Sequence, residues 1–84
     1  MCEFKSLEMV TETEDKVYYV DPGDAEFERC FGVAVSLKLN SEDSACVKNL
    51  FFTRGEAEKC CFWLAQNDVE PIILHEVLSN FYQL

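Results

Sequence analysis

Residues 30–39 alternate strictly between two kinds of side chain, and this alternation restricts the fold more than any other stretch of the chain. One set of positions holds large apolar residues: Phe31, Val33, Val35, Leu37 and Leu39. The other set holds Cys30, Gly32, Ala34, Ser36 and Lys38. Because successive side chains of a strand point to opposite faces, the pattern predicts a central strand with its large residues toward the core.

Three further stretches have the composition of strands: residues 5–13, 16–21 and 45–52. Short polar links join them in a way that favours hairpins over parallel crossovers. In the last stretch, Val47 and Leu50 both suit the core, although their spacing is out of phase for a regular strand. A β-bulge near Lys48 and Asn49 would bring both side chains to the same face.

The chain then changes from strand to helix period at Thr53. Thr53 and Glu56 form a capping-box pattern, which predicts a helix from about Arg54 to Asn67. Its buried stripe should follow the i, i+3, i+4, i+7 spacing. The residues at these positions are Ala57, Cys60, Cys61 and Leu64.

A second helix is expected from about Leu74 to Gln83, after a link in which Pro71 biases Glu70 toward an extended conformation. Its apolar face would consist of Leu74, Val77, Leu78 and Phe81. Ile73 stands where a Ser, Thr or Asp cap is usual, so the start of this helix should be weak. Glu76 in the first turn compensates in part through the helix dipole.

These elements predict an α+β fold for residues 1–84 as a single domain. We expect a four-stranded, mainly antiparallel sheet in ββββαα order, with two C-terminal helices packed on one face. Packing both helices on the sheet supplies the second layer that a single sheet needs to bury its apolar face.

The C-terminal stretch resembles a family of small uncharacterised bacterial proteins, found mostly in Gram-positive anaerobes and classed as a domain of unknown function. About 30 of the 84 residues carry the resemblance. The matching residues within that stretch are Phe52-Thr53-Arg54, Glu56-Ala57, Leu64, Asn67-Asp68-Val69-Glu70-Pro71-Ile72 and Leu74-His75-Glu76-Val77-Leu78. The family pattern is a strand, a capped helix, an Asn-x-Val-x-Pro link and a short terminal helix, and it implies no activity. Ile73 departs from the Thr expected there.

The net charge of −9 restricts the partners. Direct binding of nucleic acid requires a basic surface, and anionic membranes also attract basic segments, so neither is expected. A protein partner, or a second copy of the chain, fits the composition better. The sequence shows neither a secretory signal nor an apolar run long enough to span a membrane, which predicts a cytoplasmic protein.

The five cysteines are an odd number in a chain without a secretory signal, which predicts reduced thiols. They are Cys2, Cys30, Cys46, Cys60 and Cys61. We expect Cys60 and Cys61 to be buried and slow to react, and Cys2 to react fast near a frayed terminus. Adjacent helical cysteines do not converge on one ion, so no metal site or cofactor is predicted. No catalytic residues are assigned either, because the single His75 has no accompanying oxyanion motif, and the chain is not expected to be an enzyme.

The sequence therefore favours a non-enzymatic protein-interaction or regulatory module. Phe62 and Trp63 are the candidate interface residues, because they flank a helix whose apolar arc is wider than one sheet needs. The small residues Gly32, Ala34 and Ser36 offer a second surface on the sheet. Two alternatives remain: an acidic inhibitor that mimics nucleic acid and binds a basic protein, and a thiol- or metal-dependent sensor.

Overall fold

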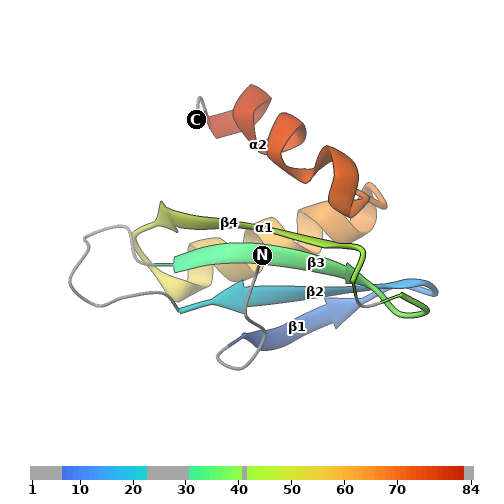
Figure 1. The fold of residues 1–84 in the computed structure, drawn as a ribbon. Helices are drawn as coiled ribbons and strands as arrows, with labels where there is room; N and C mark the ends of the chain where they lie inside the picture. The colour runs from blue at the N-terminus through green and yellow to red at the C-terminus, as the bar shows by residue number, and fades with distance from the viewer. Residues whose placement is uncertain (1–6, 23–30, 41, 83–84) are drawn as a thin grey trace.

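The computed structural model describes residues 7–22, 31–40 and 42–82, with residues 81 and 82 described by their backbone alone. Four strands form one antiparallel sheet in the order β1-β2-β3-β4, and two helices follow (Figure 1). The elements are β1 (Glu8–Glu12), β2 (Lys16–Asp21), β3 (Phe31–Leu37), β4 (Ser44–Phe51), α1 (Arg54–Gln66), the 3₁₀ turn η1 (Pro71–Ile73) and α2 (Leu74–Tyr82). The predicted α+β fold in ββββαα order is confirmed.

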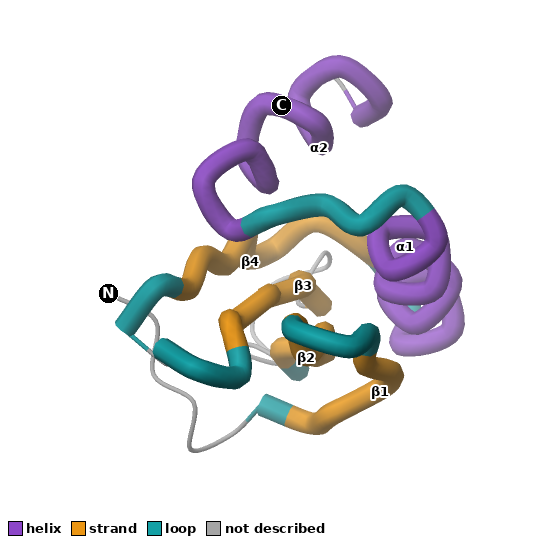
Figure 2. Tube along the Cα trace, turned by 90° about the vertical axis from the view of Figure 1, so that its right-hand side faces the viewer, coloured by secondary structure: helices purple, strands orange, loops and turns teal. Residues whose placement is uncertain are grey.

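The two helices occupy different positions beside the sheet (Figure 2). Helix α1 lies across one face and contacts all four strands. Helix α2 lies beyond the β4 edge, where α2 and η1 pack mainly against β4. The core between these layers is continuous. Its fully buried aliphatic and aromatic members are Tyr18, Val20, Val33, Val35, Ala57, Leu64, Leu74 and Leu78.

Strand β3 pairs with β2 on one side and β4 on the other, which confirms the predicted central strand. Val33 and Val35 are fully buried on the α1 face, as the alternation indicates. The prediction is wrong for Leu39, whose side chain is 98% exposed. The strand ends at Leu37, where its backbone N–H donates to the carbonyl of Asp43 and the chain turns toward β4.

The predicted β-bulge in β4 is present. Phe31 pairs with Phe51 and Val33 with Val47, so three residues of β4 lie opposite Gly32 alone. Asn49 adopts a left-handed conformation, with φ of 56°, within this segment. The bulged backbone crosses Gly32 so closely that a Cβ there would clash with the Val47 carbonyl oxygen. A side chain at position 32 is therefore incompatible with the bulge.

Helix α1 begins as the sequence predicts. The Thr53 Oγ1 accepts a hydrogen bond from the Glu56 N–H, and the Glu56 carboxylate accepts one from the Thr53 N–H. All four residues of the predicted stripe are buried. The described helices are all too short or too polar to cross a membrane.

The start of α2 shows why no side-chain cap is needed at Ile73. Glu70 is extended, with φ and ψ of −83° and 157°, as expected before Pro71. The chain then makes one 3₁₀ turn, in which the Ile73 N–H donates to the Glu70 carbonyl, and continues directly into α2. The turn satisfies backbone donors that would otherwise require a cap. The side chain of Phe81, predicted for the apolar face, lies outside the described part.

The small residues on the sheet face turned away from α1 are not exposed. Gly32, Ala34 and Ser36 are all buried, with Ala34 fully inaccessible. The alternative that these small residues offer a free docking surface is therefore wrong. Their cross-strand neighbours Val17, Tyr19 and Cys46 on this face are only partly buried, whereas the flank of α1 carries a groove.

Candidate binding groove between α1 and β4

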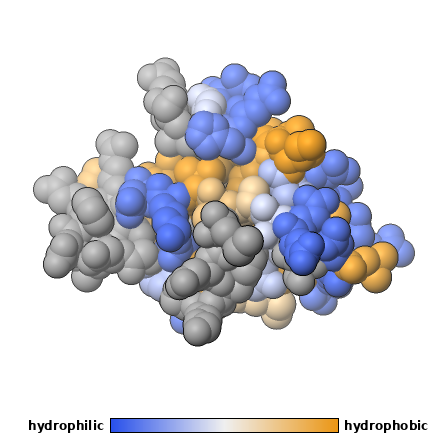
Figure 3. Space-filling model, viewed as in Figure 1, coloured by the Kyte–Doolittle hydropathy of each residue, from blue (hydrophilic) through white to orange (hydrophobic). Residues whose placement is uncertain are grey.

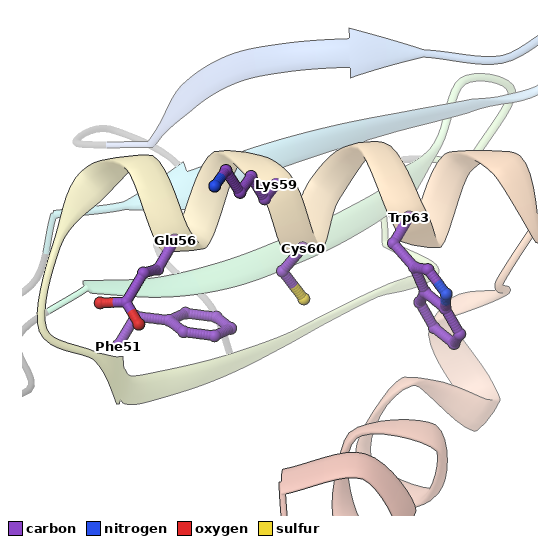
Figure 4. Close-up of a pocket in the computed structure, with 5 residues that line it drawn as sticks. All are labelled: Phe51, Glu56, Lys59, Cys60 and Trp63. Carbon is purple, nitrogen blue, oxygen red and sulfur yellow. The ribbon is translucent and has the colours of Figure 1, made fainter.

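A groove of about 260 Å³ runs along one flank of α1, between the helix and the end of β4 (Figure 4). Its lining residues are Phe51, Glu56, Lys59, Cys60 and Trp63. The Phe51 ring and the Cys60 thiol form an apolar floor, and the Trp63 ring points from α1 toward α2. Glu56 and Lys59 are the polar side chains of its rim.

Two local features create this groove. The pairing of Phe51 with Phe31 at the end of β4 places Phe51 on the core side, where it is 5% exposed, while the next residue, Phe52, turns outward. The capping box fixes where α1 starts, so Cys60 lies on the buried stripe and Trp63 on its flank. Trp63 is partly buried and packs against the core. The groove is consequently an extension of the core surface to solvent.

The two candidate interface residues lie on opposite flanks of α1. Trp63 lines the groove, whereas Phe62 does not line it and is 51% exposed. Phe62 belongs to the flank on which Arg54 pairs with Glu8 of β1 and with Glu58. The structure therefore separates the two aromatics: Trp63 belongs to a concave surface, and Phe62 is a single exposed side chain.

The two charged residues at the rim, Glu56 and Lys59, differ in their bonding. The Glu56 carboxylate is engaged by the Thr53 backbone and hydroxyl at 3.2 and 3.1 Å, so it is part of the helix cap. Lys59 is exposed and forms no ion pair within residues 7–22, 31–40 and 42–82. The polar rim is narrow in comparison with the apolar floor.

Beyond Trp63 the groove leads to the link between α1 and η1, residues 67–70, which is hydrogen-bonded to the sheet. The Asn67 side-chain amide donates to the Trp63 carbonyl at 2.8 Å, and the Tyr18 hydroxyl donates to the Val69 carbonyl at 2.9 Å. Burial raises the pKa of Tyr18 to about 12. These bonds fix residues 67–69 against β2, and Asp68 adopts a left-handed conformation there, with φ of 51°.

Lys16 forms the second tie between β2 and this link. Its side chain is 2% exposed, and its Nζ lies 2.8 Å from Asp68 Oδ1 and 3.1 Å from Asp15 Oδ2. The hydrogen bond to Asp68 raises the pKa of Lys16, although burial acts in the opposite direction. The hydrogen bond from Lys16 lowers the pKa of Asp15. The Lys16 ammonium is therefore buried and adds no positive charge to the surface, but it holds the exposed carboxylates of Asp15 and Asp68 in place.

Three connections meet at this end of the sheet. The Lys38 N–H donates to the Asp15 carbonyl at 2.9 Å, which places the β3–β4 loop beside the β1–β2 turn, and Lys16 adds the α1–η1 link. We call this region the acidic end. Its exposed carboxylates are Glu12, Glu14, Asp15, Glu42, Asp43, Asp68 and Glu70. Its two lysines are both in ion pairs, Lys16 as above and Lys38 with Glu12 at 3.4 Å. Hydrophilic surface predominates on this side (Figure 3, right).

The cysteines do not all conform to the prediction. Cys60 and Cys61 are reduced and buried, as expected, and Cys61 donates its thiol hydrogen to the Tyr19 carbonyl at 3.3 Å. Burial raises the pKa of Cys61 to about 12. Cys46, however, is disulfide-bonded, so the expectation of reduced thiols throughout is wrong at this position. Cys2, predicted to react fast, lies outside the described residues.

The described ranges contain no assembled catalytic or metal site of the kinds considered from sequence. The Nδ1 of His75 lies 3.5 Å from the Ser79 hydroxyl, one turn further along α2, and both residues are outside the groove. In the part of the chain that the structure describes, no three His, Cys, Asp or Glu side chains come together in a way that could hold a metal ion.

Comparison with known proteins adds no further constraint. No family model, curated protein or solved structure matches the chain. The candidate site therefore depends on its geometry alone.

Sequence reasoning identified Trp63 but missed two other residues that matter here. Phe51 could have been found, because it lies four residues after Val47 and so shares its strand phase, which is the buried one. Lys16 could also have been found, because it shares the strand phase of Tyr18 and Val20, and that phase is the buried one. The pairing of Lys16 with Asp68 had no signal, since the two residues are far apart in sequence.

Proposed function

We propose that this protein is a non-enzymatic protein-interaction module that binds its partner at the groove between α1 and β4. The observation that supports this most directly is the position of Trp63. Its ring is partly buried on the wall of an apolar-floored groove that is open to solvent. Tryptophans in such half-desolvated positions contribute strongly to protein interfaces, because they add a large apolar area at small entropic cost.

The size of the groove also favours a protein partner. A volume of about 260 Å³ is below the roughly 300–1,000 Å³ of typical small-molecule pockets. It suits one or two apolar side chains of a larger partner. Such a partner would have to cover surface beyond the groove to reach the roughly 1,000 Å² that specific interfaces bury.

Paired substitutions test the proposal. Trp63→Ala should abolish retention of partners from a cytosolic extract, and Phe62→Ala, on the opposite flank, should leave the same proteins bound. Circular dichroism and urea denaturation must show that both variants remain folded. Sedimentation of the wild-type protein shows whether a second copy is the partner. Equal retention by both variants would contradict a binding role for the groove.

The acidic inhibitor is a second candidate, favoured by the seven carboxylates of the acidic end. In this function the acidic end would replace the phosphates of a nucleic acid on a basic protein. Such binding should weaken steeply between low and physiological salt, because exposed charges are screened within about 8–10 Å. An interface centred on the groove should depend much less on salt.

The cytoplasmic location is also part of the proposal, and the Cys46 disulfide is the observation against it. Disulfides are rare in reducing compartments, except where they are transient and respond to redox state. A thiol-dependent sensor would become the better proposal if this bond opened and closed reversibly and changed partner binding. Partner retention measured with and without a reductant, on the same protein, separates the two cases.

A further inference from the structure

We propose that the occupant of the groove is a basic amphipathic segment of the partner, with its apolar residues on Trp63 and its basic residues over the acidic end. This inference rests on the proposed interaction function and adds the chemical class of the partner. It requires that the apolar groove be continuous with the exposed carboxylates of the acidic end.

Hydrogen bonds connect the groove to the acidic end. Trp63 stands at the end of the groove nearest the link, and its carbonyl accepts from both the backbone N–H and the side-chain amide of Asn67. Asp68 follows at once, and its carboxylate is held by Lys16. A segment that buries an apolar side chain against Trp63 therefore has exposed carboxylates within the next few residues of its path.

The charge balance of this region selects a cationic segment. The acidic end has seven exposed carboxylates against two lysines, which leaves an excess of five negative charges. Neither lysine offers its charge to a ligand, because Lys16 is buried and Lys38 pairs with Glu12. Lys59 is the one lysine or arginine that lines the groove, and it forms no ion pair with any residue that the structure describes; it lies at the rim along the outer surface of α1 (Figure 4).

Apolar residues on one face and basic residues on the other describe an amphipathic helix that docks in a groove. The groove extends over about two turns of α1, from Glu56 to Trp63, which matches one or two anchors at i and i+4. The charges then determine orientation and association rate more than affinity. A second copy of the chain is disfavoured as occupant, because each copy carries a charge of −9.

Trp63 is the only tryptophan, so its fluorescence reports on the groove directly. The probes are three synthetic peptides of roughly 14 residues with helical spacing: leucine with lysine, leucine with glutamate, and alanine with lysine. The leucine–lysine peptide should shift the Trp63 emission to shorter wavelength and bind at least tenfold more tightly than the other two. Glu14→Gln and Glu70→Gln should each weaken that binding roughly two- to fivefold. Glu58→Gln, the matched charge change on the opposite flank, should change it by less than about twofold.

Four results would overturn the inference. Equal binding of the leucine–glutamate peptide would leave the groove as a binding surface but refute the basic partner. Equal binding of the alanine–lysine peptide would show that charge alone suffices, without the groove. An emission shift on concentrating the protein alone would make a second copy the occupant. Binding of none of the peptides would refute the basic amphipathic class, while partner retention by wild-type protein and its loss in Trp63→Ala would still support the interaction function.

Discussion

Replacing Tyr18 by Phe removes one oxygen atom and tests whether the link before α2 is held by a buried hydrogen bond. Tyr18 is fully buried, and its hydroxyl donates to the Val69 carbonyl at 2.9 Å. The ring remains after the substitution, so no cavity forms. The expected cost is that of a buried acceptor left without its donor, about 1–3 kcal/mol. In a domain of this size, 1 kcal/mol corresponds to about 4–8 °C in melting temperature.

Urea denaturation monitored by circular dichroism measures this cost as a lower midpoint at unchanged slope. Asn67→Ala is the matched control, because it also removes a side-chain donor to a backbone carbonyl, but one exposed to water. Its cost should stay below about 1 kcal/mol. A Tyr18→Phe protein within about 0.3 kcal/mol of wild type would refute the reasoning, since the Val69 carbonyl would then have a substitute for the hydroxyl.

The same residue gives a pH dependence. The pKa of Tyr18 is about 12 in the folded protein, against 10.0 for an unperturbed tyrosine. Between these values the folded state holds a proton that the unfolded state has lost, so the free energy of unfolding falls as pH rises from about 10 to 12. Lys16, whose pKa is also raised, acts in the same direction. Tyr18→Phe should show a shallower decline over this range, and an unchanged decline would remove Tyr18 as its source.

Two further predictions concern the bulge and the thiols. Gly32→Ala should destabilise the protein by about 1–3 kcal/mol or prevent folding, because the added Cβ meets the backbone of Val47. Thermal melting measures this loss. An unchanged melting temperature would show that the bulge adjusts to a side chain at little cost. Cys60 and Cys61 should resist a thiol reagent at pH 8 in the native protein and react once the protein is denatured. Mass spectrometry without reductant should show Cys46 unlabelled in both the native and the denatured protein. Fast native labelling of Cys61 would contradict its burial.

The fold could be predicted from sequence because its local signals agree with one another. The alternation in residues 31–37, the capping box at Thr53 and the stripe on α1 each specify an element whose buried side is clear. The bulge was predictable because Val47 and Leu50 cannot face the core in one regular strand. Leu39 was mispredicted because alternation does not reveal where a strand ends.

The candidate site was less accessible to prediction. Trp63 and Phe62 look equivalent in sequence, and only the packing of α1 beside the end of β4 places Trp63 on a concave flank and leaves Phe62 exposed on the other. The acidic end gathers residues from three connections, and its formation depends on contacts between residues more than 50 positions apart, such as Lys16 with Asp68. Periodicity contains no information on such contacts. The Cys46 disulfide was missed because an odd cysteine count says nothing about any particular pair.

The irregular pairing at both margins of the sheet has a consequence for behaviour at high concentration. Strand β1 has a register shift between Met9 and Thr11 and carries a glutamate at each end, and β4 has its bulge opposite Gly32. Regular, flat edge strands recruit further strands and start fibrils, whereas bulges and charges interrupt that addition. The described sheet is therefore a poor template for polymerisation, and the chain should tolerate crowding without forming ordered aggregates.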